Sequence, residues 1–330
     1  MAFQVVEKPV GERKVFTLID TTSGASASVL PAFGFNLFDL RLPVGKEVRP
    51  IIVADADFAQ NPRDAGRNGT PILFPYPNRV RDGKFEFGGK SYQLPITLGP
   101  NAIHGFALDT PWDVQEKGTN DHEAFIVGRW NLAMNAPKMR GLWPTDATLH
   151  VRYALAGRKL SMTVTVSNPT DQPLPYGFGI HPYFRLPFEK GSDQTKTSVS
   201  LPCSKYWELQ EFLPTGEKKP VDARLDFRKG QPIKGLKLDD VLTDIRFDDG
   251  KATCDLVDQN LDARFRLTFD KGFRELVCYT PKGDGDVISL EPYTQTTDAI
   301  NLQQKKVDAG LRVLEHGDSA VFTIGMETLG

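Results

Sequence analysis

The stretch Lys159-Leu-Ser-Met-Thr-Val-Thr-Val-Ser167 alternates strictly between apolar and polar side chains. Leu160, Met162, Val164 and Val166 fall on one side of such a segment, which is the period of a half-buried β-strand. The preceding segment, residues 148–155, has a similar character, and the short link between the two contains Gly157. The two segments are therefore predicted to form a β-hairpin.

Short strands of the same kind recur along the whole chain, separated by turns that contain Gly, Pro, Asn or Asp. No stretch of 12 or more residues carries a helical stripe, and the 24 prolines and 29 glycines suit a chain rich in turns. Many short strands and few helices indicate an all-β sandwich or barrel. No linker, repeat or shift in composition divides the chain, so residues 1–330 are predicted to form one large antiparallel β domain. Further strands are expected at 15–19, 27–30, 36–42, 124–130, 198–201, 245–247, 263–269, 275–279, 287–291, 311–314 and 320–326.

The overall charge excludes some partners. The formal net charge is -2, and no run of basic residues offers a field that would attract nucleic acid or an anionic membrane.

The three cysteines, Cys203, Cys254 and Cys278, are odd in number and widely spaced, which fits a reducing compartment better than a disulfide framework. The N-terminus lacks the pattern of a signal peptide, and no apolar run approaches the roughly 20 residues of a membrane helix. A cytoplasmic location is expected.

One candidate catalytic group is a histidine at the end of an expected strand. The segment 174–180 is predicted to be a strand that runs into His181. Pro182 would end the strand because proline has no N–H for the ladder. With Tyr183 and Phe184 directly behind it, His181 is a good candidate for an imidazole held rigidly at the rim of a cleft.

Two other segments supply groups that could work with His181. His104 lies in Asn101-Ala-Ile-His-Gly-Phe106, and Glu291 lies in Ile288-Ser-Leu-Glu-Pro-Tyr-Thr294. A glutamate can act as a general base and a histidine as a general acid near neutral pH. A free glutamate has a pKa of about 4.3, so Glu291 needs partial desolvation to become an effective base. The aromatic residues expected to provide it are Tyr293, Phe106 and Phe184.

The region from residue 54 to 110 contains few convincing strands. Long segments of this kind in a compact domain are usually functional or disordered, and the aromatic and proline residues here favour an ordered, functional loop. Its polar part, residues 54–68, is expected to be an insertion near the cleft. The other histidines, His122, His150 and His316, are interpreted as ordinary structural or solvent-facing residues.

Taken together, the segments resemble the aldose 1-epimerase (galactose mutarotase) family. The similarity runs in order from about residue 15 to residue 326. The segments that carry it are Gly69-Thr-Pro-Ile-Leu-Phe-Pro-Tyr-Pro-Asn-Arg79, the hairpin-like 83–94, Asn101–Phe106, His181-Pro-Tyr-Phe184, Leu213-Pro-Thr-Gly216, Leu238-Asp-Asp-Val-Leu242, Leu290-Glu-Pro292 and Asp298-Ala-Ile-Asn-Leu302.

The resemblance implies a large antiparallel β-sandwich of the galactose mutarotase type with a sugar in an open cleft. It implies an isomerase that interconverts the α and β anomers of a free aldose, of the glucose or galactose type, with no cofactor and no metal. Glu291 would take the proton of the C1 hydroxyl and His181 would protonate the ring oxygen. His104 would help to polarise that oxygen. The sugar hydroxyls would be bound by Arg79, Asn78, Tyr183 and an acidic residue, Asp239 or Asp240.

Two positions depart from the family pattern. The acidic loop reads Asp239-Asp240 where family members often have Asp-His, so the sequence does not decide which carboxylate faces the sugar. The common Gly-Arg pair is Asn78-Arg79 here, which leaves the conformation of the turn open.

Three other readings stay open. A sugar-phosphate epimerase, such as a hexose-6-phosphate mutarotase, could clamp a phosphate with Arg79, Arg81 and Arg185. A non-catalytic carbohydrate-binding protein could use Trp112, Trp143 and Trp207 as stacking platforms. A metal enzyme could be built from His104, His181 and Glu291, although no closely spaced histidine pair is present to seed such a site. The sequence also leaves open whether the protein is a monomer or a homodimer.

Overall fold

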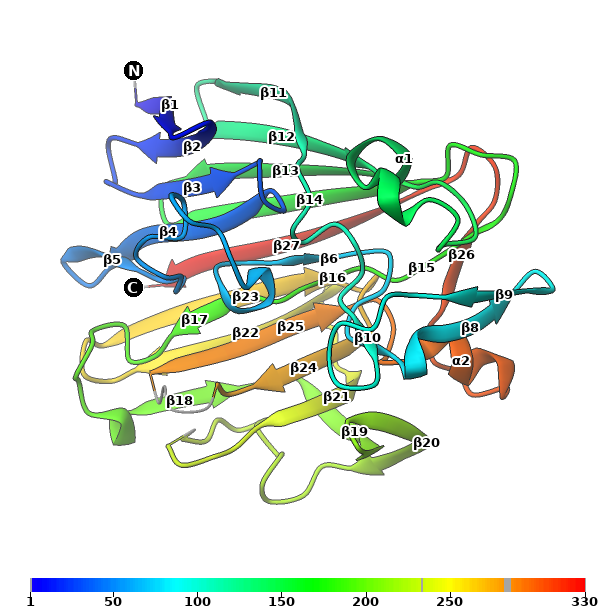
Figure 1. Ribbon diagram of the computed structural model, residues 1–330. Coiled ribbons are helices and arrows are strands. Elements are labelled where there is room, and N and C mark those ends of the chain that lie inside the picture. Colours follow the sequence, from blue (N-terminus) through cyan, green and yellow to red (C-terminus); the bar gives the residue numbers. More distant parts are fainter. Residues whose placement is uncertain (1, 233, 282–285, 330) are drawn as a thin grey trace.

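The computed structural model describes residues 2–232, 234–281 and 286–329, and in these ranges the chain is built almost entirely of antiparallel β-strands (Figure 1). The predicted all-β fold is confirmed. The predicted hairpin is also confirmed: β13 (Thr148–Ala156) and β14 (Lys159–Ser167) pair with Val151 opposite Val164. Within these ranges, no helix is long and apolar enough to cross a membrane.

Two large sheets form the body of the molecule, and a smaller sheet leads into it from the N-terminus. The N-terminal sheet has the order β1 (Phe3–Val10), β2 (Arg13–Asp20), β3 (Ser26–Leu30), β4 (Asn36–Val44) and β5 (Glu47–Pro50). The first large sheet has the order β11 (Asp113–Thr119), β12 (Ala124–Asn131), β13, β14, β27 (Ser319–Leu329), β23 (Ala263–Asp270), β22 (Lys251–Asp258) and β18 (Thr197–Ser200).

The second large sheet carries the segments singled out from the sequence. Its order is β20 (Leu213–Pro220), β19 (Cys203–Gln210), β21 (Asp239–Ile245), β24 (Glu275–Tyr279), β25 (Val287–Tyr293), β16 (Gly179–Ile180) and β6 (Ile72–Leu73), with β17 (Tyr183–Arg185) also pairing with β25. Short pairs complete the described strands: β7 (Arg79–Val80) with β10 (Ala102–Ile103), β8 (Lys84–Phe87) with β9 (Lys90–Gln93), and β15 (Leu174–Tyr176) with β26 (Arg312–Leu314).

Helical segments are short. They are the α-helices α1 (Leu132–Asn135) and α2 (Ala299–Gln304) and the 3-10 turns η1 (Ala65–Arg67), η2 (Arg81–Gly83), η3 (Pro137–Met139) and η4 (Gln194–Lys196). In Figure 1, α2 lies beside the β8–β9 hairpin, away from the broad faces of the large sheets.

The main hydrophobic core lies between the two large sheets. It includes Leu256 and Leu267 of the first sheet together with Leu242, Leu276 and Leu290 of the second. A separate, smaller cluster packs on the opposite face of the second sheet and consists of Leu73, Trp207, Val241, Val277 and Tyr293. Strand β25 is buried along both of its faces, so groups that it projects away from the core are also shielded from water.

The prediction of one strand over residues 174–180 is wrong in one respect, because this segment forms two short strands, β15 and β16. Residues 174–176 pair with β26, whereas Gly179 pairs with both β25 and β6. Between them the backbone N–H of Phe178 donates to the Thr294 hydroxyl at 2.8 Å. The backbone therefore changes partners at Gly177, where a Cβ atom would come within 2.2 Å of the Gln295 side chain. The strand expected at 245–247 is also wrong, because β21 covers the preceding residues and ends at Ile245.

Candidate active site

Strand β25 places one set of side chains on the face of the second large sheet that is turned away from the core. Successive side chains of a strand point to opposite sides. Ile288 and Leu290 enter the main core. Ser289, Glu291 and Tyr293 therefore lie on the other face, which we call the site face. An otherwise apolar, buried strand with polar groups at every second position is the sequence signal that marks this arrangement.

His181 reaches the site face from the link between β16 and β17. Its backbone N–H donates to the carbonyl of Pro71 at 3.0 Å, and its ring stacks on Tyr183 with centroids 4.7 Å apart. Tyr279 forms a T-shaped contact with the same ring, with centroids 5.9 Å apart. The ring nitrogen Nε2 is 3.2 Å from Oε1 of Glu291. The structure therefore brings the predicted acid and the predicted base into direct contact.

Ser289 sets the tautomer of His181. The Ser289 hydroxyl lies 2.9 Å from Nδ1 of the ring and 2.8 Å from the carbonyl oxygen of Pro182. A hydroxyl has one proton, and the carbonyl can only accept it, so the same hydroxyl oxygen accepts the Nδ1–H of the imidazole. Nε2 is then left to exchange a proton with Glu291. Ser289 was not among the residues predicted from the sequence.

Glu291 is 1% exposed, and this burial raises the pKa of its carboxyl well above the usual range. The Tyr293 hydroxyl donates a hydrogen bond to Oε2 and opposes part of that rise. Tyr293 thus contacts Glu291, as expected. Phe184 and Phe106 do not take the expected place: Phe184 packs on Phe265 in the main core, and Phe106 packs against Tyr76. Phe184 follows Tyr183 in a strand, so it points to the opposite face.

His104 faces His181 edge-on, with ring centroids 5.6 Å apart. Its backbone has a φ of 68°, an uncommon conformation for a residue other than glycine. Its ring Nδ1 accepts the backbone N–H of Asn78 at 3.2 Å, and the backbone N–H of His104 donates to the carbonyl of Asn78 at 3.0 Å. Nε2 must therefore carry the proton of the neutral ring. Burial, together with the charge of Arg79, lowers the pKa of His104 well below the usual value, so this ring is a neutral donor.

Asn78 and Arg79 form the turn that the sequence left open. Asn78 has a φ of 57°, which glycine and asparagine adopt most readily, so the change from glycine is compatible with the turn. The Asn78 side-chain oxygen accepts from the backbone N–H of Arg79 at 2.9 Å and from its guanidinium at 3.0 Å. The guanidinium also lies over the ring of Phe212, 4.8 Å from its centroid. These contacts fix a cation near the carboxyl of Glu291, whose pKa it lowers in part.

The two neighbouring aspartates lie in different environments. Asp240 forms a bidentate ion pair with Arg224, at 2.9 and 2.7 Å, on the opposite face of the strand. Asp239 is partly buried on the site face, and its charge acts on Glu291 and on Arg79. Burial raises the pKa of Asp239, and Arg79 opposes that rise. The alternation of the strand thus places Asp239 with the cluster and Asp240 outside it.

The polar segment 54–68 does lie at the cluster. The carbonyl of Gly66 accepts from the Tyr183 hydroxyl at 2.6 Å, and a Cβ atom at Gly66 would lie 3.9 Å from Cδ2 of His104. Burial raises the pKa of Tyr183, and the charge of the adjacent Arg67 acts in the other direction. Arg67, Tyr279 and Phe212 join the site although nothing in their local sequence pattern marks them.

The alternative platforms for sugar stacking are not available. Trp112, Trp143 and Trp207 are 5%, 3% and 1% exposed, so none of them presents an open ring face. Their indole N–H groups donate to other groups of the protein: to the carbonyls of Ala107 and Pro175 and to the carboxyl of Glu275.

Among the residues that the structure describes, no group of three or more His, Cys, Asp or Glu side chains is arranged to hold a metal ion.

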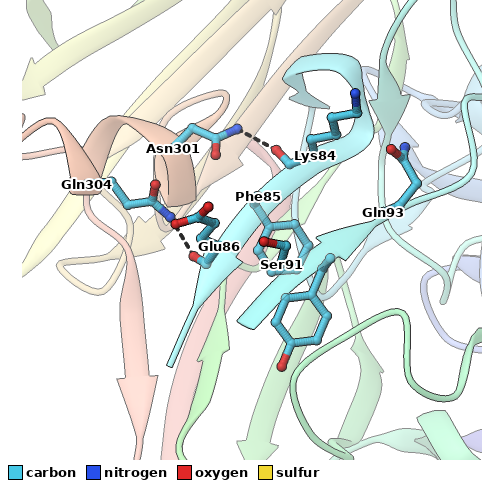
Figure 2. A pocket seen from close by; sticks show the side chains of 8 residues that line it. Lys84, Phe85, Glu86, Ser91, Gln93, Asn301 and Gln304 are labelled. Atoms are coloured by element: carbon cyan, nitrogen blue, oxygen red, sulfur yellow. Dashed lines mark hydrogen bonds between the residues drawn. The ribbon is translucent and has the colours of Figure 1, made fainter. Parts of the chain in front are cut away.

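A pocket of about 420 Å³ lies between α2 and the β8–β9 hairpin, as Figure 2 shows. Asn301 of α2 donates to the carbonyl of Lys84 at 2.9 Å and so joins the two elements. The backbone N–H of Asp298, at the start of α2, donates to the carbonyl of Arg79 at 2.9 Å. None of the predicted site residues lines this pocket.

Solved structures with the same fold extend over essentially the whole chain. A galactose mutarotase-like protein from Clostridium acetobutylicum superposes with a TM-score of 0.89 at 22% identity, covering 100% of this chain and 99% of the other. Galactose 1-epimerase from Lactobacillus acidophilus superposes with a TM-score of 0.76 at 19% identity, covering 99% and 98%. At these identities the likeness shows the fold, which is the predicted sandwich of the galactose mutarotase type.

Sequence relatives indicate the family. Mouse galactose mutarotase is 28% identical over 156 residues, covering 46% of this chain and 43% of its own length. The Escherichia coli K12 protein YihR is 27% identical over 172 residues, covering 51% and 52%. The chain thus spans about half the length of these curated relatives. The family model described as aldose 1-epimerase matches residues 15–327, nearly all of the sequence. The chain belongs to the aldose 1-epimerase family.

Proposed function

We propose that this protein interconverts the α and β anomers of a free aldose of the glucose or galactose type. The observation that carries the proposal is the buried contact of 3.2 Å between Nε2 of His181 and Oε1 of Glu291, with His104 facing the same imidazole. An acid and a base that touch each other can exchange protons with two neighbouring oxygens of one small molecule. Membership of the aldose 1-epimerase family supports a sugar as that molecule.

The reaction requires one proton to leave the sugar and another to enter it. Glu291 takes the proton of the C1 hydroxyl, and the electrons of that O–H bond form the C1 carbonyl. The bond between C1 and the ring oxygen breaks, its electrons stay on the ring oxygen, and His181 gives that oxygen a proton. Rotation about C1–C2 and closure on the other carbonyl face return the protons and yield the other anomer.

This cycle needs one proton in the Glu291–His181 pair, placed on the imidazole. Burial lowers the pKa of His181 to about 3 and raises that of Glu291, so burial alone favours the neutral arrangement with the proton on the carboxyl. Stabilisation of the charged arrangement comes from hydrogen bonds to the carboxylate and from the charge of Arg79. The Tyr293 hydroxyl and the C1 hydroxyl of a bound sugar supply such bonds. The desolvated carboxylate is then a far stronger base than a free one.

The surrounding groups hold the pair and the sugar. Ser289 keeps the Nδ1–H of His181 engaged, so that Nε2 is the proton-transferring nitrogen. Neutral His104 directs its Nε2–H toward the ring oxygen, where negative charge develops. Arg79, Asn78, Asp239 and Tyr183 bind the hydroxyl groups, with Arg79 held in place by Phe212.

The direct test is polarimetry on freshly dissolved α-D-galactose and α-D-glucose. The protein is expected to accelerate the approach to the equilibrium rotation of at least one of them. Galactose 6-phosphate and glucose 6-phosphate are measured in parallel. If only the two phosphates are accelerated, the substrate is a sugar phosphate and not a free sugar. If none of the four sugars is accelerated although the protein binds sugar, the catalytic proposal is refuted.

A further inference from the structure

A second pocket on the second large sheet is strongly basic. Its volume is about 340 Å³, which lies within the usual range for small-molecule sites. Its lining combines positively charged side chains with the apolar side chains of Ile245, Phe247 and Phe273. Asp244 is the acidic residue in its lining. The positively charged groups are Lys205, Lys218, Lys271 and Arg274.

The charges in this pocket are only partly compensated. Arg274 is held by Asp308 at 2.8 and 3.0 Å, and Lys205 lies 3.8 Å from Asp244. Lys218 lies over the Trp207 ring at 4.3 Å, and Nζ donates to the backbone carbonyl of Asp308 at 3.5 Å. Within the described residues, neither Lys218 nor Lys271 has a carboxylate within 4 Å. The pocket therefore has two ammonium groups available for an anionic ligand.

A buried carboxyl next to this pocket offsets only part of its positive charge. Glu275 lies 3.8 Å from Nε of Arg274, and its Oε2 accepts the indole N–H of Trp207 at 3.0 Å. Its Oε1 is buried and has no hydrogen-bond partner among the described residues. Burial raises the pKa of Glu275 to about 7, and hydrogen bonds from Thr243 and Trp207 and the charges of Arg274 and Lys218 oppose that rise. A carboxyl in this state carries only part of a negative charge at neutral pH.

The pocket is separate from the Glu291–His181 pair although both belong to the same face of the sheet. Lys205 is paired with Thr243 across β19 and β21, and Glu275 is paired with Tyr293 across β24 and β25. The apolar cluster that includes Trp207 and Tyr293 lies between the pocket and the pair. A ligand in the pocket therefore need not compete with a sugar at Glu291.

We propose that this pocket binds a small organic phosphate, with the phosphate held by the amines of Lys205, Lys218 and Lys271. Ammonium groups bind phosphate oxygens through charge-assisted hydrogen bonds. The apolar side chains of Ile245, Phe247 and Phe273 in the lining suit the non-polar part of an ester better than a free inorganic ion. This inference does not depend on the proposed sugar chemistry, because it concerns binding at another place.

Calorimetric titration with phenyl phosphate and with inorganic phosphate tests the proposal. Phenyl phosphate is expected to bind one site per chain, more tightly than inorganic phosphate, and less tightly at high salt. The double variant Lys205→Gln/Lys271→Gln should weaken binding by roughly tenfold or more, the loss expected for one or two charge-assisted contacts. The matched control Lys46→Gln/Lys138→Gln removes two exposed lysines elsewhere and should change affinity by less than about twofold.

Glu291→Gln serves as a second control, because binding in the basic pocket should persist in it. Unaltered circular dichroism must accompany each loss of binding. An absence of saturable binding, an equal loss in the control double variant, or loss in Glu291→Gln would overturn the site. Equal affinity for the two phosphates would overturn its assignment to an organic ester.

Discussion

Glu291 and Glu275 are buried carboxyls that neighbouring strands project onto the same face of one sheet, and they differ in their partners. Glu291 is 1% exposed and Glu275 is 0% exposed, and burial raises the pKa of both. Each accepts a hydrogen bond from an aromatic side chain, Tyr293 or Trp207. Glu291 touches the imidazole of His181, a group that can gain or lose a proton, whereas Glu275 lies 3.8 Å from the guanidinium of Arg274, which stays charged. Both carboxyls thus have a raised pKa, but only Glu291 has a neighbouring imidazole with which it can exchange a proton.

The largest expected difference is in catalysis. Glu291→Gln keeps the size of the side chain but cannot accept the C1 proton, so anomer exchange should fall by about 10²–10⁴-fold. Glu275→Gln should stay within about threefold of the wild type, because Glu275 contacts no group of the proton-transferring pair. Polarimetric rates of the two variants check this. Comparable losses in both would show that burial of charge, and not contact with His181, is what matters.

The next effect concerns stability, and it should appear at Glu275. Its pKa is raised from 4.5 to about 7 in the folded state, so the folded chain binds more protons than the unfolded chain between these values. Wild-type stability should therefore decrease as the pH rises from about 4.5 to 7, and Glu275→Gln should not show this loss. The free energy of unfolding of the variant, relative to wild type, should increase by about 3 kcal/mol over that window.

Urea denaturation at pH 4.5 and pH 8 measures this difference. The Gln side chain keeps an oxygen for the indole N–H of Trp207, so packing is matched. A difference between variant and wild type that is independent of pH would mean that Glu275 has an ordinary pKa in the folded protein.

A smaller effect separates the two aspartates. Asp239→Asn weakens a hydroxyl-binding group on the site face and should raise KM by roughly tenfold, or about 1.4 kcal/mol. Asp240→Asn disturbs the exposed ion pair with Arg224 and should leave KM within about twofold. Initial rates over a range of sugar concentrations compare the two variants. A larger change at Asp240 would reverse the assignment drawn from the alternation of β21.

The sequence predicted the strands with a strict period of two, and it singled out His104, His181 and Glu291, each of which directly precedes a glycine or a proline. It did not predict Ser289 as the partner of His181, because the contact joins segments 108 residues apart. It also missed Arg67 and Phe212, which reach the site through loops whose course no local periodicity specifies. The choice between Asp239 and Asp240 required the register of β21, which decides the face of every residue in the strand.

The break of the central strand at residues 177–178 shows the same limit. Local composition favoured an unbroken strand, but its two halves pair with different strands, β26 and β25. Pairing over such distances is a tertiary effect that outweighs local propensity. The segment 54–68 lacks a clear pattern for the same reason, since its fit against Tyr183 and His104 depends on the assembled sheet.

The pH dependence of kcat/KM for anomer exchange tests most directly the claim that Glu291 and His181 share one working proton. At low pH the pair binds a second proton and the base is lost, whereas at high pH the pair loses its proton and the acid is lost. The account therefore predicts a bell-shaped profile, whose two limbs belong to the pair as a whole. A rate that rises or falls through a single limb, or stays constant from pH 4 to 10 after subtraction of the uncatalysed reaction, would contradict it.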